Sequence, residues 1–259
     1  MLRQIYALTV RELKHWYRVK IQIFMTLIQP LFWLLLFGQA ISLPGTGGEN
    51  YFSYLAVGML SIVTLFTCMF SGMSIVWDRR FGFLNKLRAS PIERGVIPTS
   101  RVLATMIRAL ISAAIVLVLA LSFTYIPGLD GLTFYDGFTA LDLLGMFLVL
   151  LLLSLGFAAA FTIMALRIRS QEVLFGLINL VNLPLLFASS ALFPIDGMPE
   201  WLQTIAKANP VTWSADALRY FAFNLPGIFS LGTNLALLAG FAIGLVALGA
   251  LLARKVLTE

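Results

Sequence analysis

Six long apolar runs constrain the fold of this chain more than any other feature. Each is close to the roughly 20 residues that an α-helix needs to cross a hydrocarbon core about 30 Å thick. The runs lie near Ile21–Ser42, Ser53–Val76, Val102–Ile126, Leu141–Leu166, Val173–Phe193 and Ile228–Ala253. Because lipid offers no hydrogen-bond partner to the backbone, each run is expected to be a helix, not a strand. The sequence therefore predicts an all-α integral membrane protein with six transmembrane helices, forming a single domain over residues 1–259.

Composition and charge support this class. Hydrophobic residues make up 60% of the chain and charged residues 12%, far from the average of soluble proteins. Apart from Arg108, which lies within the third run, all Lys and Arg residues except Lys207 and Arg219 fall in the stretches that the six runs would place on one side. The positive-inside rule then predicts a multi-pass protein of the cell membrane with both termini in the cytoplasm. The cations flank apolar runs and form no single patch, so nucleic acid is not an expected partner despite a pI near 9.7.

Residues 1–20 carry an amphipathic pattern. Its apolar members are Leu2, Ile5, Leu13 and Trp16, and its cationic members are Arg3, Arg11, Lys14 and Arg18. The spacing predicts a helix on the inner leaflet, with its cations at anionic headgroups of membrane lipid and Trp16 in the aromatic belt. The alternative is a positively charged leader that serves topology alone.

A cytoplasmic stretch from residue 77 to residue 101 is rich in cations. Within it, Phe81, Leu84 and Leu87 recur at spacings of three and share one face of a short helix, which Pro91 ends or redirects. Such a helix suits docking into a groove on a partner protein. A solvated basic loop that serves topology alone is the other interpretation.

Residues 194–227 are expected on the outer side as two short helices. Pro199 can open the first and Thr212 can cap the second. Neither is long enough to span the bilayer, so both are expected to be interfacial or re-entrant. Asp216 and Arg219 are three residues apart and are expected to pair on the polar side. The residues singled out in this segment are Pro199, Trp201, Asn209, Pro210, Asp216 and Arg219.

Polar residues inside the expected spans form two further candidate features. Ser61, Thr64, Cys68 and Ser71 make a weakly polar stripe on the second span, and Asn179, Asn182 and Ser189 fall near one face of the fifth. Pro184 is expected to kink the fifth span. Each set can line a substrate path or hydrogen-bond one helix to another.

The sequence lacks the motifs that would let the chain power transport or catalyse a reaction by itself. There is no GxxxxGK[ST] phosphate loop, and no expected span has an acidic residue at its centre, where ion-driven carriers usually place one. His15 and Cys68 are each the single residue of their type, so no Cys/His metal site or His-based catalytic set can form. The interpretation that remains is a subunit that obtains its energy from a partner. The alternatives are a self-contained channel or secondary carrier, and a membrane-bound enzyme or scaffold.

Two stretches resemble a known family. Residues 77–92, WDRRFGFLNKLRASPI, resemble the first cytoplasmic loop of type-2 ATP-binding-cassette (ABC) exporter permeases, which include daunorubicin-type drug exporters and polysaccharide exporters. A second match lies before the last span. It consists of Phe193-Pro194, Met198-Pro199, Trp201-Leu202, Asn209-Pro210, Asp216-Ala217 and Arg219.

The resemblance implies a transport subunit that is not itself an enzyme. It implies a homodimer carrying two copies of a separate ABC ATPase, which would bind ATP and Mg²⁺, with no cofactor in this chain. The coupling helix entering the ATPase would consist of Arg80, Phe81, Gly82, Phe83, Leu84, Asn85, Lys86 and Leu87, followed by Pro91. Substrate would pass between protomers along Thr64, Phe66, Asn179 and Asn182. An amphipathic drug, lipid or lipid-linked molecule is the expected cargo, and a polysaccharide or glycolipid is the alternative.

Overall fold

The computed structural model describes residues 2–41, 46, 50–80, 95–168 and 170–256 of the chain. Within these residues the regular secondary structure is entirely helical, as the apolar runs predict. The α-helices are α1 (Leu2–Arg18), α2 (Lys20–Ala40), α3 (Tyr51–Arg80), α5 (Val96–Ser122), α6 (Ala140–Arg167), α7 (Gln171–Phe187), α8 (Glu200–Lys207), α9 (Pro210–Phe223) and α10 (Leu231–Val256). Two single-turn 3₁₀ helices, η1 (Phe123–Tyr125) and η2 (Ile195–Gly197), complete the set.

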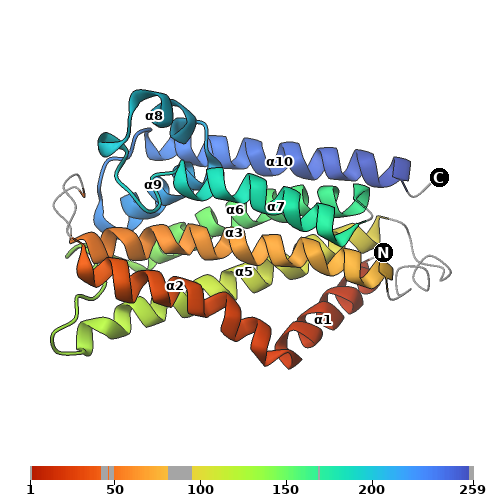
Figure 1. Cartoon of the computed structure of the whole chain (residues 1–259), viewed down its shortest axis with the longest axis horizontal. Coiled ribbons are helices and arrows are strands. Elements are labelled where there is room, and N and C mark those ends of the chain that lie inside the picture. The colour runs from red at the N-terminus through yellow and green to blue at the C-terminus, as the bar shows by residue number, and fades with distance from the viewer. Residues whose placement is uncertain (1, 42–45, 47–49, 81–94, 169, 257–259) are drawn as a thin grey trace.

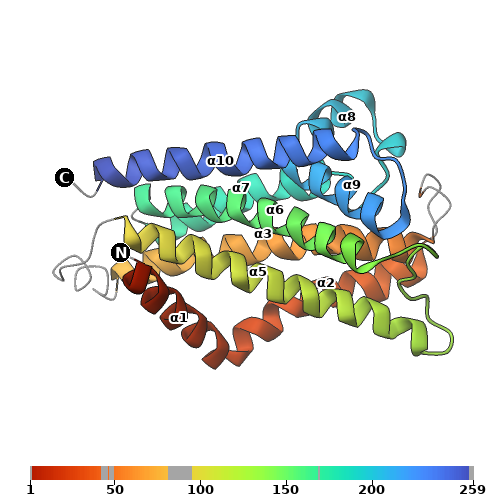
Figure 2. The same ribbon diagram turned by 180° about the vertical axis from the view of Figure 1, so that it is seen from behind.

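The long helices run side by side along one axis (Figures 1 and 2). Helix α1 begins and α10 ends at the same end of this bundle, whereas α8 and α9 lie at the opposite end. Helices α1 and α2 form a V whose point lies outside the bundle. The described ends of the chain therefore lie at one end of the bundle and the short helices at the other. The side of the membrane on which each lies stays a prediction.

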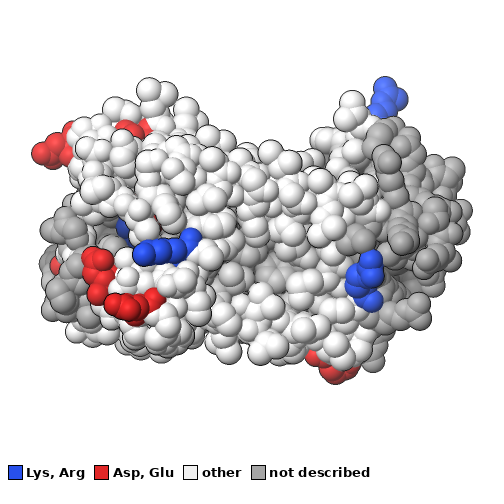
Figure 3. Space-filling model, turned by 90° about the horizontal axis from the view of Figure 1, so that it is seen from above, with Lys and Arg blue, Asp and Glu red and all other residues white. Residues whose placement is uncertain are grey.

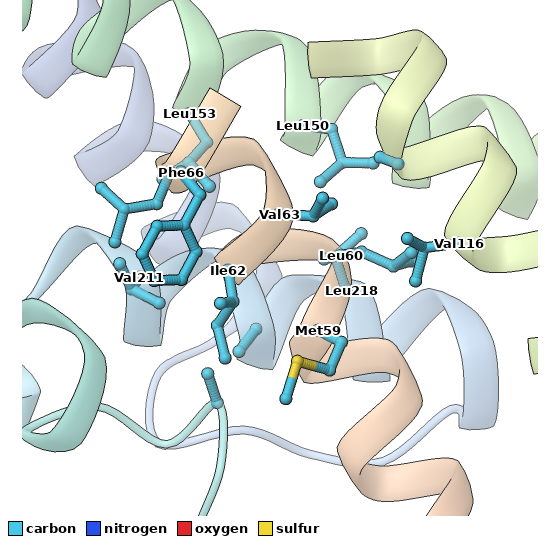
Figure 4. Close-up of a cluster of buried hydrophobic side chains, with 14 of the residues drawn as sticks. Met59, Leu60, Ile62, Val63, Phe66, Val116, Leu150, Leu153, Val211 and Leu218 are labelled. Carbon is cyan, nitrogen blue, oxygen red and sulfur yellow. The ribbon is translucent and has the colours of Figure 1, made fainter. Parts of the chain in front are cut away.

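Helix α3 is the centre of the bundle. It contacts α2, α5, α6, α7 and α9, and its apolar segment Tyr51–Gly72 is almost completely buried. Figure 4 shows its side chains leaving in different directions, with Val63 towards Leu150 of α6 and Phe66 towards Val211 of α9. A helix that is apolar on every side can be buried on every side, which explains its central position.

Four helices of the described chain are long and apolar enough to cross a membrane. Their apolar segments are Tyr51–Gly72, Val96–Tyr125, Ala140–Ala165 and Leu231–Leu251. The first and fifth expected spans coincide with shorter apolar segments, Thr26–Ala40 and Gln171–Phe187, so the number of six stays a prediction. Figure 3 shows one face of the molecule, where charged side chains gather towards the two ends and the middle carries none. That uncharged band is what a membrane-spanning protein presents to lipid.

The fifth apolar run ends as a helix earlier than predicted. The prediction extends it to Phe193, but α7 ends at Phe187. Asn209, from the chain before α9, donates from Nδ2 to the carbonyls of Leu185 at 2.9 Å and Ala188 at 2.6 Å. Because this side chain satisfies the carbonyls at the helix end, the chain can leave the helix without unpaired backbone groups.

The start of the second outer helix also differs from the prediction. Asn209 caps α9, not Thr212: its Oδ1 accepts from the Val211 backbone N–H at 2.9 Å, and Pro210 occupies the first helical position. Thr212 is buried, and its hydroxyl accepts from the backbone N–H of Ser190 at 3.1 Å. The asparagine that caps α9 thus also binds the end of α7.

Gly58 of α3 is a position where the packing leaves no room for a side chain. A Cβ there would lie 2.0 Å from the backbone oxygen of Ala191. We expect Gly58→Ala to lower the free energy of unfolding by about 1–3 kcal/mol, because α3 and the turn after α7 must separate. The matched control is Gly176→Ala in α7, where a Cβ meets no heavy atom within 4 Å. Thermal unfolding in detergent compares the two, and equal stabilities would contradict this account of the contact.

Candidate functional site

The predicted coupling segment lies almost entirely outside the described residues. Arg80 is the last residue of α3, and the remaining members follow it. They are Phe81, Gly82, Phe83, Leu84, Asn85, Lys86, Leu87 and Pro91. The described chain resumes just before α5, at the end of the bundle where α1 begins. The segment therefore connects the central helix α3 to α5, which also contacts α1.

A buried charged cluster joins α1 to α5. Oε1 of Glu12 lies 3.5 Å from Nη2 of Arg101, and Oε2 of Glu12 lies 3.7 Å from Nη2 of Arg108. The three side chains are 10% exposed or less. Nearby, the hydroxyl of Thr9 donates to the Ser100 carbonyl at 3.3 Å. If α1 left α5, these charges would lose their partners, so the cluster links the position of α1 to that of α5.

This cluster corrects the predicted face of the first helix. Leu2 was expected on its apolar side but is 83% exposed, whereas Glu12 and Thr9 are buried together with Trp16. Arg11, Lys14 and Arg18 are exposed, as the amphipathic pattern predicts. Sequence reasoning missed the cluster, because hydrophobic periodicity does not show which charged residues meet across the fold. The available signals were one acid among the cations of residues 1–20 and Arg108 inside an apolar run.

A second buried cluster lies at the opposite end, around Arg219 of α9. Its Nη2 donates to the carbonyls of Tyr54 at 3.2 Å and Ala191 at 3.1 Å. Its guanidinium carbon lies 3.4 Å from the centre of the Tyr54 ring, a cation–π contact. Nη1 of Arg219 lies 3.7 Å from Oδ1 of Asp216, so the predicted pair is present. Both residues are buried, however, and the prediction that they lie on the polar side is wrong.

Asp216 extends this cluster to two more segments. It accepts from the Ser190 hydroxyl at 2.8 Å and from the backbone N–H of Ile228 at 3.0 Å. The pair thus connects α3, the turn after α7, α9 and the chain leading to α10. The arrangement fixes the positions of these four segments relative to one another and shows no nucleophile paired with a base for covalent chemistry.

The other outer residues lie at the edges of the two short helices. Pro199 precedes α8 as its cap residue, and α8 begins at Glu200, close to the predicted start. Trp201 is 66% exposed. Asn209 and Pro210 begin α9, as described above. The short helix α8 therefore presents an aromatic side chain outward, while α9 is packed against α3, α6 and α10.

The four predicted path residues lie on α3 and α7 and differ in their exposure and their hydrogen bonds. Thr64 is fully buried, and its hydroxyl donates to the Leu60 carbonyl of its own helix at 2.8 Å. Phe66 is buried, and Asn179 is partly exposed and donates to the Phe175 carbonyl at 3.0 Å. Asn182 is 4% exposed, and its Oδ1 has no hydrogen-bond partner among the described residues.

The polar stripe on α3 has structural partners in neighbouring helices. The hydroxyls of Ser61 and Ser214 are 2.8 Å apart, and Ser71 is hydrogen-bonded to Thr105 of α5. Cys68 lies within reach of the Ser154 carbonyl. These contacts favour the interpretation that the stripe joins helix to helix.

Comparison with known proteins agrees with this architecture. The family described as ABC-2 type transporter matches residues 3–223. The chain is 30% identical over 227 residues to the transport permease ycf38 of Pyropia yezoensis, covering 85% of this chain and 74% of that protein. It is 26% identical over 224 residues to the daunorubicin resistance ABC transporter permease protein DrrB1 of Streptomyces coeruleorubidus, covering 85% and 75%. The chain is a multi-pass membrane protein that belongs to the ABC-2 type transporter family.

Proposed function

We propose that this chain is the membrane-spanning permease subunit of an ATP-driven exporter. The observation that carries the proposal is the family match, which extends from α1 to α9. The sequence has no phosphate loop, so ATP and Mg²⁺ would be bound by two copies of a separate ABC ATPase. This chain would contribute the path through the membrane and the contacts through which the ATPase moves its helices.

The coupling segment is proposed to transmit ATPase closure to the bundle. It lies between α3, which contacts five other helices, and α5, which is joined to α1 through Glu12. A displacement of residues 81–94 would therefore act on the central helix at one end and on the α1–α5 pair at the other. Such a rigid-body movement needs no chemistry within the membrane.

The double replacement Phe83→Asp with Leu84→Asp tests this coupling. We expect the variant to insert into the membrane normally but to lose the ATPase on purification, because charged side chains cannot enter an apolar groove. The measurement is co-purification of the ATPase together with transport in vesicles. The matched control is Phe83→Leu with Leu84→Met, which alters the same two positions but keeps them apolar and should retain the ATPase. Undiminished transport by the Asp variant would contradict the assignment.

The transport path is proposed to lie between two copies of this chain. Helices α2 and α7 both contact α3, and both have exposed apolar side chains, among them Phe24 and Phe32 of α2 and Leu180 and Leu183 of α7. Asn182 of α7 is buried, and its amide oxygen has no hydrogen-bond partner among the described residues, so it is the α7 residue that we propose for the path. A second protomer at these helices would enclose α3 and create the outward route.

The proposed cargo is an amphipathic drug, lipid or lipid-linked molecule. The broad apolar surface of α2 supports it, as does the drug-resistance name of one relative. A polysaccharide or glycolipid is the alternative within the same family. Substrate-stimulated ATPase activity of the reconstituted complex separates the two, because only the transported class raises the rate. Stimulation by glycans alone would reject the amphipathic cargo.

A further inference from the structure

The last turn of α2 is attached to the loop between η1 and α6 by one side chain. Gln39 of α2 donates from Nε2 to the Asp130 carbonyl at 2.8 Å, and its Oε1 accepts from the Asp130 backbone N–H at 2.8 Å. The side-chain amide therefore pairs with both backbone groups of one residue, because it offers a donor and an acceptor together. Both bonds are exposed, so water can take the place of either partner when they break.

The loop next to Asp130 is itself fixed to the bundle. The backbone N–H of Leu132 donates to the Ala120 carbonyl of α5 at 3.1 Å. The hydroxyl of Ser53 on α3 donates to the Gly131 carbonyl at 3.4 Å. Gln39 therefore binds a point that is attached to α3 and α5, so its two bonds set the position of the outer end of α2 relative to those helices.

The outer end of α7 is held in a different way. The carbonyls of Ser190 and Leu192, in the chain after α7, accept from the hydroxyls of Tyr54 and Tyr51 on α3, each at 3.0 Å. Arg219 adds the buried bond to this segment that is described above. Because these bonds are buried, water cannot replace them unless the surrounding side chains separate. Of the two helices at the proposed path, α2 is thus the one whose outer polar attachment can be exchanged for water.

The shape of α2 allows its outer half to move separately. Pro30 lies inside the helix and has no N–H for the bond to the preceding turn, so α2 can bend there. The inner end of α2 follows α1 after a non-helical residue, Val19, and α1 is linked to α5 through Glu12. A tilt about Pro30 would therefore displace the outer half of α2 while its inner half stays in place.

We propose that Gln39 and the backbone of Asp130 form a latch that closes the outer end of the transport path. The inference rests on the proposed function, in which the path lies at α2 and α7. In the closed form Leu34 of α2 is fully buried, and Gly38 is so close to α3 that a Cβ would lie 2.8 Å from the ring of Phe52. Opening exchanges the two bonds of Gln39 for bonds to water, and the outer half of α2 tilts away from α3.

Labelling of a cysteine in place of Leu34 tests the latch. The reagent is a membrane-impermeant maleimide added from the outer side, and Cys68, the one cysteine of the sequence, is buried. In proteoliposomes, Leu34→Cys should react slowly, and adding Gln39→Ala should raise the rate roughly five-fold, because the open form gains population when both bonds are lost. Trapping the complex of chain and ATPase with ATP and vanadate should raise the rate in the chain that keeps Gln39.

Ser122→Ala is the matched control. This exposed hydroxyl lies at the same end of the bundle and donates to the Leu119 carbonyl of its own helix at 2.7 Å, so its loss should leave the labelling rate of Leu34→Cys unchanged. An equal rate with and without Gln39→Ala would overturn the latch, as would a trapped complex that reacts no faster than the ATP-free complex. Recovery of the chain without any ATPase would instead refute the proposed function, and the Gln39→Ala comparison, which needs no ATPase, gives its result in either case.

Discussion

Replacing Arg219 with methionine is expected to lower the free energy of unfolding by about 3–5 kcal/mol, as for other buried ion pairs that lose one partner. Methionine fills much of the space but donates no hydrogen bond. The carbonyls of Tyr54 and Ala191 lose their donor, and Asp216 remains buried without its cation. Thermal unfolding in mild detergent measures the loss, and reduced yield from the membrane is expected with it.

The exposed cation Lys207 provides the control for this prediction. Lys207→Met removes one positive charge from the same end of the molecule and should change stability by less than about 0.5 kcal/mol. In a double-mutant cycle, Asp216→Asn should cost about 1–3 kcal/mol less in the Arg219→Met background than in the unmodified chain. Additive losses would show that the two residues do not stabilise each other.

Replacing Glu12 with glutamine is the second change with a large expected effect, again about 3–5 kcal/mol. The change keeps the size of the side chain but removes its charge, so Arg101 and Arg108 lose the carboxylate that both approach. We expect α1 to separate from α5 more readily than the rest of the bundle unfolds. Hydrogen exchange should therefore become faster in the amides of α1 than in those of α3.

Glu200→Gln is the matched control for this experiment. Glu200 is exposed at the start of α8, at the opposite end of the bundle, and its replacement should leave exchange in α1 unchanged. Transport by the Glu12→Gln variant should fall further than its ATPase binding, because α1 helps to hold the helix that follows the coupling segment. Normal protection of α1 in this variant would contradict the role given to the cluster.

The helical class and the order of the helices were predictable because they follow from apolar length. Backbone groups in lipid must be satisfied within their own helix, so composition alone decided helix over strand. Helix ends were less predictable. The end of α7 depends on Asn209, which is 22 residues further along the chain than Phe187, and periodicity carries no information about such a partner.

Of the buried charged groups, the sequence predicted the pair of Asp216 and Arg219 but not the contacts of Glu12. Asp216 and Arg219 were paired by their spacing, yet only the packing of Tyr54 and Ser190 around them places the pair away from water. Glu12 and Arg108 are 96 positions apart and meet because α1 folds back onto α5. The coupling segment lies outside the described residues, so its helix and its docking role stay predictions.

The central claim is that this chain works as the membrane subunit of an ABC exporter. Its most direct test is purification of the tagged chain from its native membrane in mild detergent, followed by identification of its partners and an ATPase assay. The account predicts recovery of a phosphate-loop ATPase in a complex of two copies of each chain, with ATPase activity. A chain that is recovered alone after crosslinking in the membrane, and that conducts substrate in liposomes without any ATPase, would contradict it.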